Sequence, residues 1–339
     1  MSYYSEIYGL QVHLNQGVPG LLLSSRQSRP TDIDIHFGNM PSWFQVEQVK
    51  RKLWYLNPES GPGGKPRLTV WFMAGYYHLE YADGTQFLID NDGTRIWATW
   101  PSETLTLEDT ATYLLGPVMG FVLLLRGFVS LHACAIAVDD RAVVISGPAG
   151  SGKSTTAAVF AEQGYRILAE DVVTLRDLGA EFLVQPAYPS IRLWPASVEA
   201  LYGAADKLPK LTPTWDKCYL DLTQDKYEFQ HEPLPLAAIY VLAERSDDSA
   251  APFVEDLAPA EGLMSLVANT YATYLMDKKM RAREFEILQR VLNSVPVKRV
   301  TPHSDPARIG GLCQTILDSF ALKNPGMPAS RISEQAAHV

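Results

Sequence analysis

The sequence is poor in cysteine and contains three of these residues, Cys134, Cys218 and Cys313. They are odd in number and widely spaced, a pattern that matches neither a disulfide framework nor a zinc site. We therefore expect a reducing compartment and cysteines that pack in the core. The N-terminus also lacks a basic stretch followed by an apolar core, so no signal peptide is expected and a cytoplasmic location follows.

The chain also lacks an excess of positive charge. Its 29 Lys and Arg residues face 38 Asp and Glu residues, which gives a formal net charge of −9. General binding to nucleic acid needs clustered Lys and Arg to neutralise phosphates, so the sequence predicts no nucleic-acid partner. With 339 residues, 47% of them hydrophobic, the chain is long enough for two globular domains.

Long apolar runs are scarce as well. The most apolar stretch covers residues 113–125 and ends at Arg126. It is shorter than the roughly 20 residues that a helix needs to cross a bilayer. We therefore expect a buried helix at 113–125 and no membrane partner.

Residues 1–111 form a predicted β-rich domain. Residues 67–100 alternate aromatic or branched side chains with polar ones, and Asp83-Gly84 and Asp92-Gly93 interrupt them. These dipeptides suit tight hairpin turns, so an antiparallel meander is expected. Ser and Thr residues within 102–110 are candidate N-caps for the apolar helix that follows.

Residues 112–322 form the second predicted domain. Two strands, 131–138 and 141–146, are expected around Asp139-Asp140, followed by a helix over 153–163. Further strands are expected at 165–169 and 237–244, and helices within 260–320. The remaining residues, 323–339, show no periodicity and are expected to be a disordered tail.

The strongest signal is the pattern G-x-x-x-x-G-K-S, whose defining residues are Gly147, Gly152, Lys153 and Ser154. Glycines allow backbone N–H groups to converge on phosphate oxygens, and the following helix presents its positive end to the same anion. Lys153 is expected to reach the β- and γ-phosphates, and the Ser154 hydroxyl to bind Mg²⁺. The predicted nucleotide-binding residues are Gly147, Pro148, Ala149, Gly150, Ser151, Gly152, Lys153, Ser154 and Thr155.

Two acids and a histidine are expected beside this loop. Glu170 and Asp171 follow the strand at 165–169, and ligands in parallel sheets lie beyond the carboxyl ends of strands. One acid can hold Mg²⁺ while the other accepts a proton from an attacking hydroxyl. Geometry alone also allows the alternative that the acidic pair only holds the metal ion. If the strands 131–138 and 141–146 pair, His132 lies opposite Gly147, where it contacts phosphate or simply packs.

Two cations lie in segments that read as loops: Arg192 in "YPSIRLWP" and Lys217 in "TWDKCYLDL". A transferred phosphoryl group needs extra positive charge at its oxygens, which makes both candidates for contact with it. A solvated surface side chain is the competing interpretation for each.

Residues 130–175 resemble the catalytic core of HPr kinase/phosphorylase, a bacterial serine kinase with a phosphate loop. His132, Lys153, Ser154 and the Glu170-Asp171 pair stand at the family's positions, and the resemblance implies that Asp171 is the proton acceptor. Ser190 stands where the family has a metal-binding Glu, so Mg²⁺ would be held by Ser154, Glu170 and Asp171. Lys217 stands in for a cation of the family's Tyr-Asp-Arg-Leu-Gly motif, which this chain lacks.

The whole chain is more similar to HPr-kinase-related proteins of modified-peptide gene clusters, a group that includes kinases of lasso-peptide precursors. The matching stretches include "DGTRIWATWP" and "LPLAAIYVL". The resemblance implies an α/β fold whose P-loop kinase core is of the HPr kinase C-terminal type, with a mixed sheet. The β-rich N-terminal domain, for which substrate recruitment is the expected role, precedes this core, and a helical C-terminal region follows it. The resemblance also implies a homo-oligomer.

The resulting hypothesis is an ATP- and Mg²⁺-dependent kinase, with Asp171, His132, Lys153 and Lys217 as catalytic residues. Its partner is a peptide or small protein that bears an acceptor serine. Two alternatives remain: a kinase of small-molecule hydroxyls, and a non-catalytic module that senses nucleotide.

Overall fold

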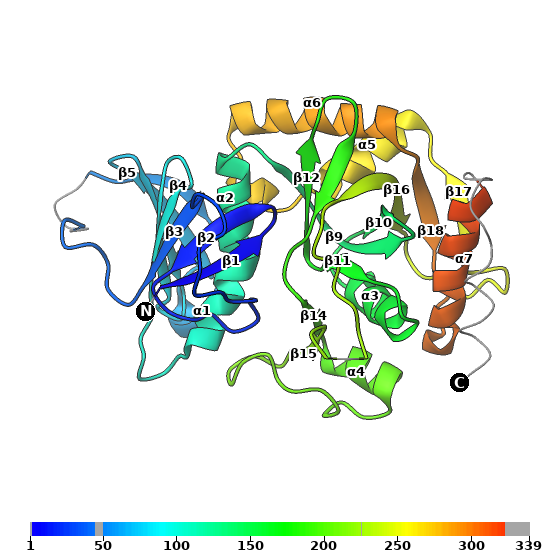
Figure 1. The fold of residues 1–339 in the computed structure, drawn as a ribbon, viewed down its shortest axis with the longest axis horizontal. Coiled ribbons are helices and arrows are strands. Elements are labelled where there is room, and N and C mark those ends of the chain that lie inside the picture. The colour runs from blue at the N-terminus through cyan, green and yellow to red at the C-terminus, as the bar shows by residue number, and fades with distance from the viewer. Residues whose placement is uncertain (1, 45–49, 225, 323–339) are drawn as a thin grey trace.

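The computed structural model describes residues 2–44, 50–224 and 226–322. The chain is a mixed α/β protein with two large sheets and several helices. Figure 1 shows the first sheet on the left, the second on the right, and the helical segment α1–α2 between them. The predicted tail, 323–339, lies outside the described residues.

The N-terminal sheet has eight strands in the order β1-β2-β3-β8-β7-β6-β5-β4. Its strands are β1 (Tyr3–Ile7), β2 (Leu10–Leu14), β3 (Ile33–Phe37), β4 (Lys52–Leu56), β5 (Leu68–Met73), β6 (Tyr76–Tyr81), β7 (Gln86–Asp90) and β8 (Arg95–Thr99), with the 3₁₀ turn η2 (Pro62–Gly64) before β5. The meander predicted over 67–100 is confirmed, because β5 to β8 pair antiparallel in chain order. Gly84 and Gly93 take positive φ values of 95° and 63° in its turns, as the two Asp-Gly dipeptides predicted.

The apolar helix starts where the sequence predicted a cap. Thr106 is the N-cap, and it forms a capping box with Asp109. The helix runs through α1 (Leu107–Tyr113), a π-helical turn η3 (Leu114–Val118) and α2 (Met119–Leu125). Pro117 lies in the π turn, where its missing N–H is tolerated by the altered hydrogen bonding.

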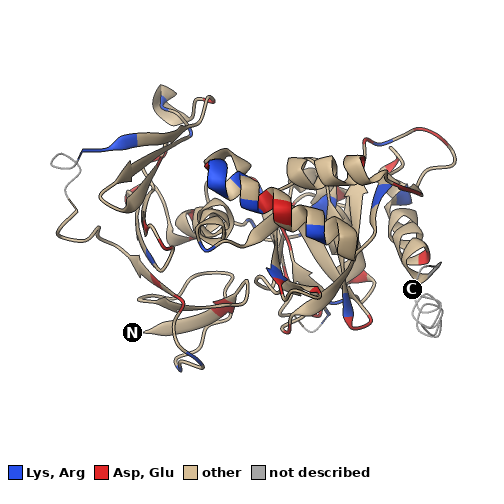
Figure 2. Cartoon of the chain, turned by 90° about the horizontal axis from the view of Figure 1, so that it is seen from above, with Lys and Arg blue, Asp and Glu red and all other residues tan. Residues whose placement is uncertain are grey.

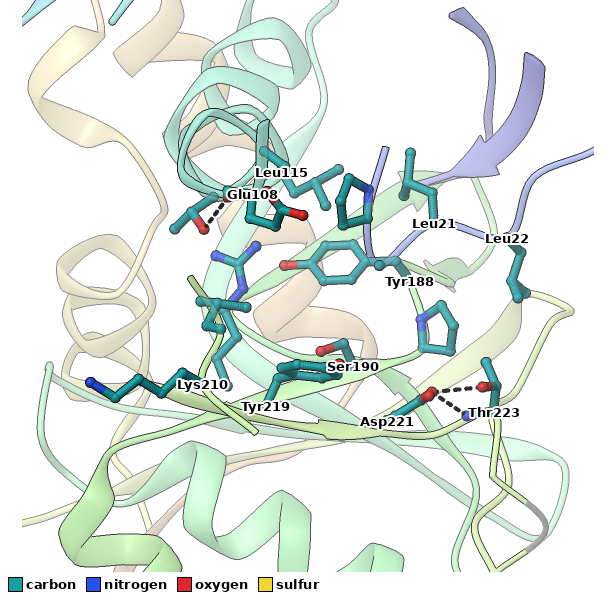
Figure 3. Close-up of a pocket in the computed structure, with 17 residues that line it drawn as sticks. Leu21, Leu22, Glu108, Leu115, Tyr188, Ser190, Lys210, Tyr219, Asp221 and Thr223 are labelled. Atoms are coloured by element: carbon teal, nitrogen blue, oxygen red, sulfur yellow. Dashed lines mark hydrogen bonds between the residues drawn. The ribbon is translucent and has the colours of Figure 1, made fainter. Parts of the chain in front are cut away.

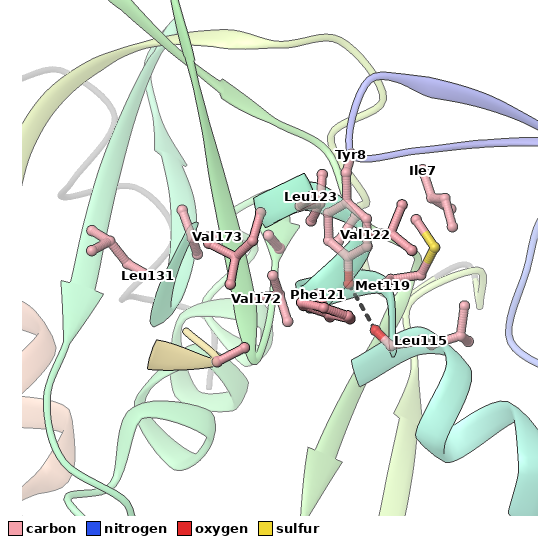
Figure 4. Packing of buried hydrophobic residues seen from close by; sticks show 14 of the residues in the cluster. Ile7, Tyr8, Leu115, Met119, Phe121, Val122, Leu123, Leu131, Val172 and Val173 are labelled. Carbon is pink, nitrogen blue, oxygen red and sulfur yellow. Dashed lines mark hydrogen bonds between the residues drawn. The ribbon is translucent and has the colours of Figure 1, made fainter. Parts of the chain in front are cut away.

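This helix is longer than the sequence suggested. The span Leu107–Leu125 has 19 residues, and within the described part of the chain it is the one helix long and apolar enough to cross a membrane. However, 78% of its apolar window is buried inside the protein. Its side chains pack between the two sheets: Figure 4 shows Phe121, Val122 and Leu123 between Ile7 on one side and Val172 on the other. The Tyr8 hydroxyl also donates to the Leu115 carbonyl at 2.9 Å.

The second sheet has eight strands, most of them in the order β10-β9-β12-β13-β16-β18-β17, with β11 paired to β9. Its strands are β9 (Val129–Val138), β10 (Arg141–Ser146), β11 (Ile167–Ala169), β12 (Val172–Asp177), β13 (Phe182–Gln185), β16 (Leu234–Leu242), β17 (Phe253–Asp256) and β18 (Val297–Thr301). β10 pairs parallel with β16 as well as antiparallel with β9, so the sheet is mixed, as predicted.

The strand β9 explains how distant segments meet. Its C-terminal half pairs with β10 and β11, and its N-terminal half pairs with β12. The predicted hairpin of 131–138 with 141–146 is therefore confirmed. The two strands that carry the phosphate loop and the acids are not direct neighbours, because β9 lies between β10 and β11. β9 runs antiparallel to β10 and to β11. The first residues of β9, near His132, therefore lie at the same edge as the last residues of β10 and β11.

The remaining elements surround this sheet. They are α3 (Lys153–Glu162), α4 (Pro195–Tyr202), α5 (Pro259–Ala268), η4 (Thr273–Leu275), α6 (Lys278–Ser294), η5 (Pro306–Arg308), α7 (Ile309–Leu322) and a two-stranded ribbon of β14 (Ser190–Leu193) and β15 (Cys218–Asp221). The region 260–320 is thus mostly helical, with β18 and short connecting segments between its helices. In Figure 2 the first part of α6 is basic, an acidic part follows, and a further basic residue lies beyond it.

The ribbon corrects one expectation. Arg192 lies on a strand rather than in a loop, because β14 pairs with β15 over all four of its residues and is buried along its whole length. The two prolines of "YPSIRLWP" flank this short strand and disguise it in the sequence.

Candidate functional site

The phosphate loop connects the end of β10 to the start of α3, as the sequence predicted. Gly150 and Gly152 adopt φ values of 80° and 102°, a left-handed region that side chains disfavour. Gly152 directly precedes the first residue of α3. The loop therefore turns backbone N–H groups and a helix N-terminus toward one point, which is an anion-binding arrangement.

Lys153 is buried at the base of this loop. Its Nζ donates to the Gly147 and Pro148 carbonyls, each at 2.8 Å. Burial lowers the pKa of the Lys153 ammonium, and the charges of Asp171 and Glu170 oppose that effect. The side chain thus folds back over the loop that it follows.

Ser154 and Glu170 join the loop to the acidic pair. The Ser154 Oγ donates to Glu170 Oε1 at 2.6 Å, while Glu170 Oε2 accepts from the Arg192 backbone N–H at 3.3 Å. Glu170 is buried, and burial, then the Asp171 charge, raises the pKa of its carboxyl. A cation beside this carboxylate would oppose both effects.

Asp171 has an unusual backbone. Its φ is +69°, and the Val172 N–H donates to the Glu170 carbonyl at 2.9 Å across it. This i to i+2 hydrogen bond around a positive φ is a γ-turn, which is rare and strained for a non-glycine residue. The turn separates β11 from β12, and both of these strands pair with β9.

The Asp171 carboxylate lies between His132 and Tyr271. Tyr271 donates its hydroxyl to Asp171 Oδ2 at 3.1 Å, and His132 Nε2 lies 3.5 Å from Oδ1. Burial raises the pKa of the Tyr271 hydroxyl, with help from the Asp171 charge, so it stays a donor. Burial and then Lys153 lower the pKa of the His132 imidazole, which favours its neutral form at neutral pH. At that pH His132 is a hydrogen-bonding group rather than a cation.

Two glycines bring the apolar helix up to these side chains. A β-carbon on Gly120 would lie 2.5 Å from Tyr271 Cδ1, and one on Gly116 would lie 3.3 Å from the Tyr271 hydroxyl and 3.5 Å from Asp171 Oδ2. Gly116 and Gly120 are four residues apart, the small-residue spacing that lets a helix approach its neighbour closely. Sequence reasoning missed Tyr271, although this spacing was visible within 113–125.

Both candidate cations lie near the acids. Arg192 is buried, its guanidinium carbon lies 5.4 Å from the centre of the Tyr188 ring, and its Nε has no hydrogen-bond partner. The charges of Tyr188, Asp171 and Glu170 raise the Arg192 pKa despite its burial. Lys217 Nζ lies 5.1 Å from the centre of the Trp194 ring. The structure therefore brings all the predicted catalytic and metal-binding residues to one region, whereas their roles stay predictions.

A cleft of about 880 Å³ opens from Asp171, and we name it the Asp171 cleft. Asp171, Arg192 and Lys217 line it together with aromatic residues from both halves of the chain. The aromatic residues in its wall are Tyr81, Tyr113, Trp215, Tyr271 and Tyr274. Tyr81 stacks on Tyr113 with ring centres 3.9 Å apart, and the Tyr113 hydroxyl donates to Asp83 at 2.8 Å. The N-terminal sheet thus supplies one wall of the cleft.

A second cavity, about 540 Å³, lies on the other side of Arg192, and we name it the Leu22 cavity. Figure 3 shows the Tyr188 ring in it, with Glu108 and Leu115 on one side and Ser190 and Tyr219 on the other. Arg192 and Thr112 line both this cavity and the Asp171 cleft.

A third cavity, about 220 Å³, adjoins the phosphate loop, and we name it the α3 cavity. Its lining joins the loop and α3 to α4 and to residues 302–312: Ser151, Gly152, Thr155, Thr156, Ala196, Ser197, Ala200, Leu201, Arg245, Pro302, His303, Asp305, Pro306, Arg308, Ile309 and Leu312. The Arg245 Nη2 lies 3.4 Å from where a β-carbon on Gly152 would be. No motif pointed to Arg245, because it follows the end of β16, far from the loop in sequence.

Metal-binding potential is limited to hard oxygen donors here. No group of three His, Cys, Asp or Glu side chains suited to a metal occurs among the described residues. Ser154 and Glu170 do converge, and Asp171 is adjacent, which fits an ion such as Mg²⁺ that takes few protein ligands and keeps several waters.

Comparison with known proteins adds little. No family model matches the chain, and no curated protein matches it. Among solved structures, the HPr(Ser) kinase/phosphatase from Coxiella burnetii is a distant match. It shares 16% identity at a TM-score of 0.32, over 58% of this chain and 93% of the other. This likeness is too weak to carry a fold or a function across.

Proposed function

We propose that the protein is an ATP-dependent kinase that transfers the γ-phosphate to a serine hydroxyl of a peptide or small protein. The observation that carries the proposal is the position of Asp171. Its carboxylate borders an open cleft, and its neighbour Glu170 is hydrogen-bonded to Ser154 of the phosphate loop. A carboxylate between a phosphate site and an acceptor space is what a general base requires.

On the phosphate side, the loop amides and the α3 N-terminus bind the phosphates. Lys153 exchanges its two carbonyl partners for phosphate oxygens. Neutral His132 hydrogen-bonds near the transferred group, and Arg192 and Lys217 supply positive charge. Ser154 and Glu170, with Asp171 and water, would hold Mg²⁺. When bound, this ion neutralises charge on the β- and γ-phosphates.

On the acceptor side, the serine hydroxyl enters through the Asp171 cleft and gives its proton to Asp171. Tyr271 holds one carboxylate oxygen through its hydroxyl, so the carboxylate has a fixed orientation. The cleft volume lies within the roughly 300–1,000 Å³ of ligand pockets. Its aromatic wall also suits apolar side chains that flank the serine.

The α3 cavity is the place for the nucleoside. It is next to the loop on the side of Ser151 and Thr155, and apolar surfaces of Leu201 and Ile309 line it with the Arg245 guanidinium. A flat base packs between such surfaces while the cation contacts the nearby phosphates or ribose.

Two other functions use the same phosphate site. A kinase of small-molecule hydroxyls would need the Asp171 cleft but no room for a polypeptide substrate. A sensing module would bind the nucleotide without transferring its phosphate. The open cleft at Asp171 favours transfer to an acceptor over sensing.

The test is incubation with Mg-ATP and candidate acceptors, followed by mass spectrometry. We expect a phosphate mass shift on serine-containing peptides in the wild type and not in Asp171→Asn. Labelling only of hydroxyl metabolites would establish the small-molecule alternative, and nucleotide binding without any transfer would establish the sensing module.

A further inference from the structure

The ribbon β14–β15 forms a floor that leads away from Asp171. In its register Ser190 pairs with Asp221 and Arg192 with Tyr219. These four side chains share one face, since alternate residues of a strand point the same way, and all four line the Leu22 cavity. The opposite face, with Ile191 and Leu220, is part of the hydrophobic core.

This floor borders the Asp171 cleft. Arg192 and Thr112 line both spaces. Arg192 and Asp171 are also close to each other: a β-carbon added to Gly116 would lie 3.7 Å from Arg192 Nη1 and 3.5 Å from Asp171 Oδ2. Arg192 and Thr112 are thus the boundary that the two spaces share, and a polypeptide bound at Asp171 would have to cross it to reach the Leu22 cavity. The two spaces, about 880 and 540 Å³, together exceed the range of typical small-molecule pockets.

The buried side chain at the junction has an unused donor. Arg192 is 7% exposed, and its Nε has no hydrogen-bond partner. Leaving a buried donor unpaired costs about 1–3 kcal/mol.

The lining beyond Arg192 suits an apolar side chain on that chain. Leu21, Leu22 and Leu115 face Tyr188 and Tyr219 across the Leu22 cavity (Figure 3). Leu22 is 44% exposed, so it offers apolar surface without being part of the core.

From this shared boundary we infer that the Leu22 cavity binds the residues next to the acceptor serine. The inference rests on the proposed kinase function. It makes the substrate an extended polypeptide segment, held by Arg192 and by an apolar side chain in the cavity, and not a free hydroxyl metabolite.

The experiment uses a pool of serine-centred peptides with randomised flanks, with N-acetylserine amide as the small acceptor. Peptides retained by the protein in ultrafiltration, with Mg²⁺ and a non-hydrolysable ATP analogue, are counted by mass spectrometry. Peptide KM is measured separately with the best-labelled sequence. The variants are Leu22→Asp and Tyr219→Ala, and the matched control is Leu178→Asp, an equally exposed leucine in the turn after β12.

We expect both cavity variants to retain at least tenfold less peptide and to raise the peptide KM at least tenfold. Their affinity for ATP and the behaviour of Leu178→Asp should equal those of the wild type. Unchanged retention and KM in both variants would overturn the inference, as would phosphorylation of N-acetylserine amide as efficient as that of peptides. If the wild type retains peptides through this cavity but transfers no phosphate, the kinase proposal fails and the peptide site stands.

Discussion

The phosphate loop is one run of consecutive residues between β10 and α3, whereas the walls of the Asp171 cleft come from segments spread between Asn57 and Tyr274. One side of the site is therefore local in sequence, and the other exists only after two sheets have packed on one helix. A local motif tolerates changes elsewhere in the chain. A dispersed wall depends on how distant elements are placed, so the two sides should respond differently to mutation.

The largest expected effect is on the local side. Lys153→Ala removes a cation from the transferred group, and we expect transfer to fall about 10³-fold or more, the scale at which such a cation acts. ATP binding should weaken as well. Steady-state transfer and calorimetry measure the two effects, with exposed Lys207→Ala as the control. Transfer within a few-fold of wild type would remove Lys153 from the mechanism.

The second largest effect is expected for Asp171→Asn, which removes the proton acceptor and leaves the phosphate loop intact. Asparagine tolerates the left-handed backbone at this position but does not accept the proton. We expect about a 10²- to 10⁴-fold lower transfer rate, with the affinity for ATP in the absence of Mg²⁺ unchanged. The control is Asp140→Asn, whose carboxylate is 95% exposed in the β9–β10 turn. A transfer rate equal to wild type in Asp171→Asn would refute its role as the base.

Arg245→Ala tests the α3 cavity. We expect the Kd for ATP to rise about tenfold, the size of one lost charge-assisted hydrogen bond. If Arg245 acts on the nucleoside, affinity for inorganic tripolyphosphate should stay the same. An equal loss for both ligands would show that Arg245 contacts phosphate alone, and Arg176→Ala, an exposed residue of β12, is the control.

Gly120→Ala tests the dispersed side through its closest contact. The new methyl group would collide with the Tyr271 ring, which must move away from Asp171. Overpacking of this kind costs about 1–3 kcal/mol of folding free energy, and we expect a several-fold lower transfer rate with normal ATP affinity. Tyr271→Phe removes the hydroxyl without the collision. If Gly120→Ala slows transfer while Tyr271→Phe does not, the hydroxyl contact is not what matters.

The smallest effect is on the pH dependence of stability. Because the folded-state pKa of Glu170 is raised, the folded protein binds its proton more tightly than the unfolded chain. Between the ordinary pKa and the raised one, stability therefore falls as pH rises. Urea unfolding without Mg²⁺ should show a shallower fall over this window in Glu170→Gln. An identical pH profile in the two proteins would mean that Glu170 ionises without cost.

The predictability of the site follows from the same division. Residues that are neighbours in sequence determine the phosphate loop, the hairpin β9–β10 and the meander β5–β8. Local sequence patterns were therefore sufficient to predict these three elements. The placement of Asp171 depended on β9 pairing with both β11 and β12, which no local pattern encodes. Tyr271 and Arg245 reach the site from distant elements, so only packing reveals them. Arg192 seemed to lie in a loop because prolines flank a strand that is stable only against β15.

The helix Leu107–Leu125 belongs to both halves of the molecule. It caps on Thr106, buries its side chains against both sheets and carries the two glycines beside Tyr271. A chimera that takes the N-terminal sheet from a related chain must respect this double contact. A seam before Thr106 would mismatch the helix with the new sheet, and a seam at Arg126-Gly127, where the helix ends, would mismatch its glycines with Tyr271.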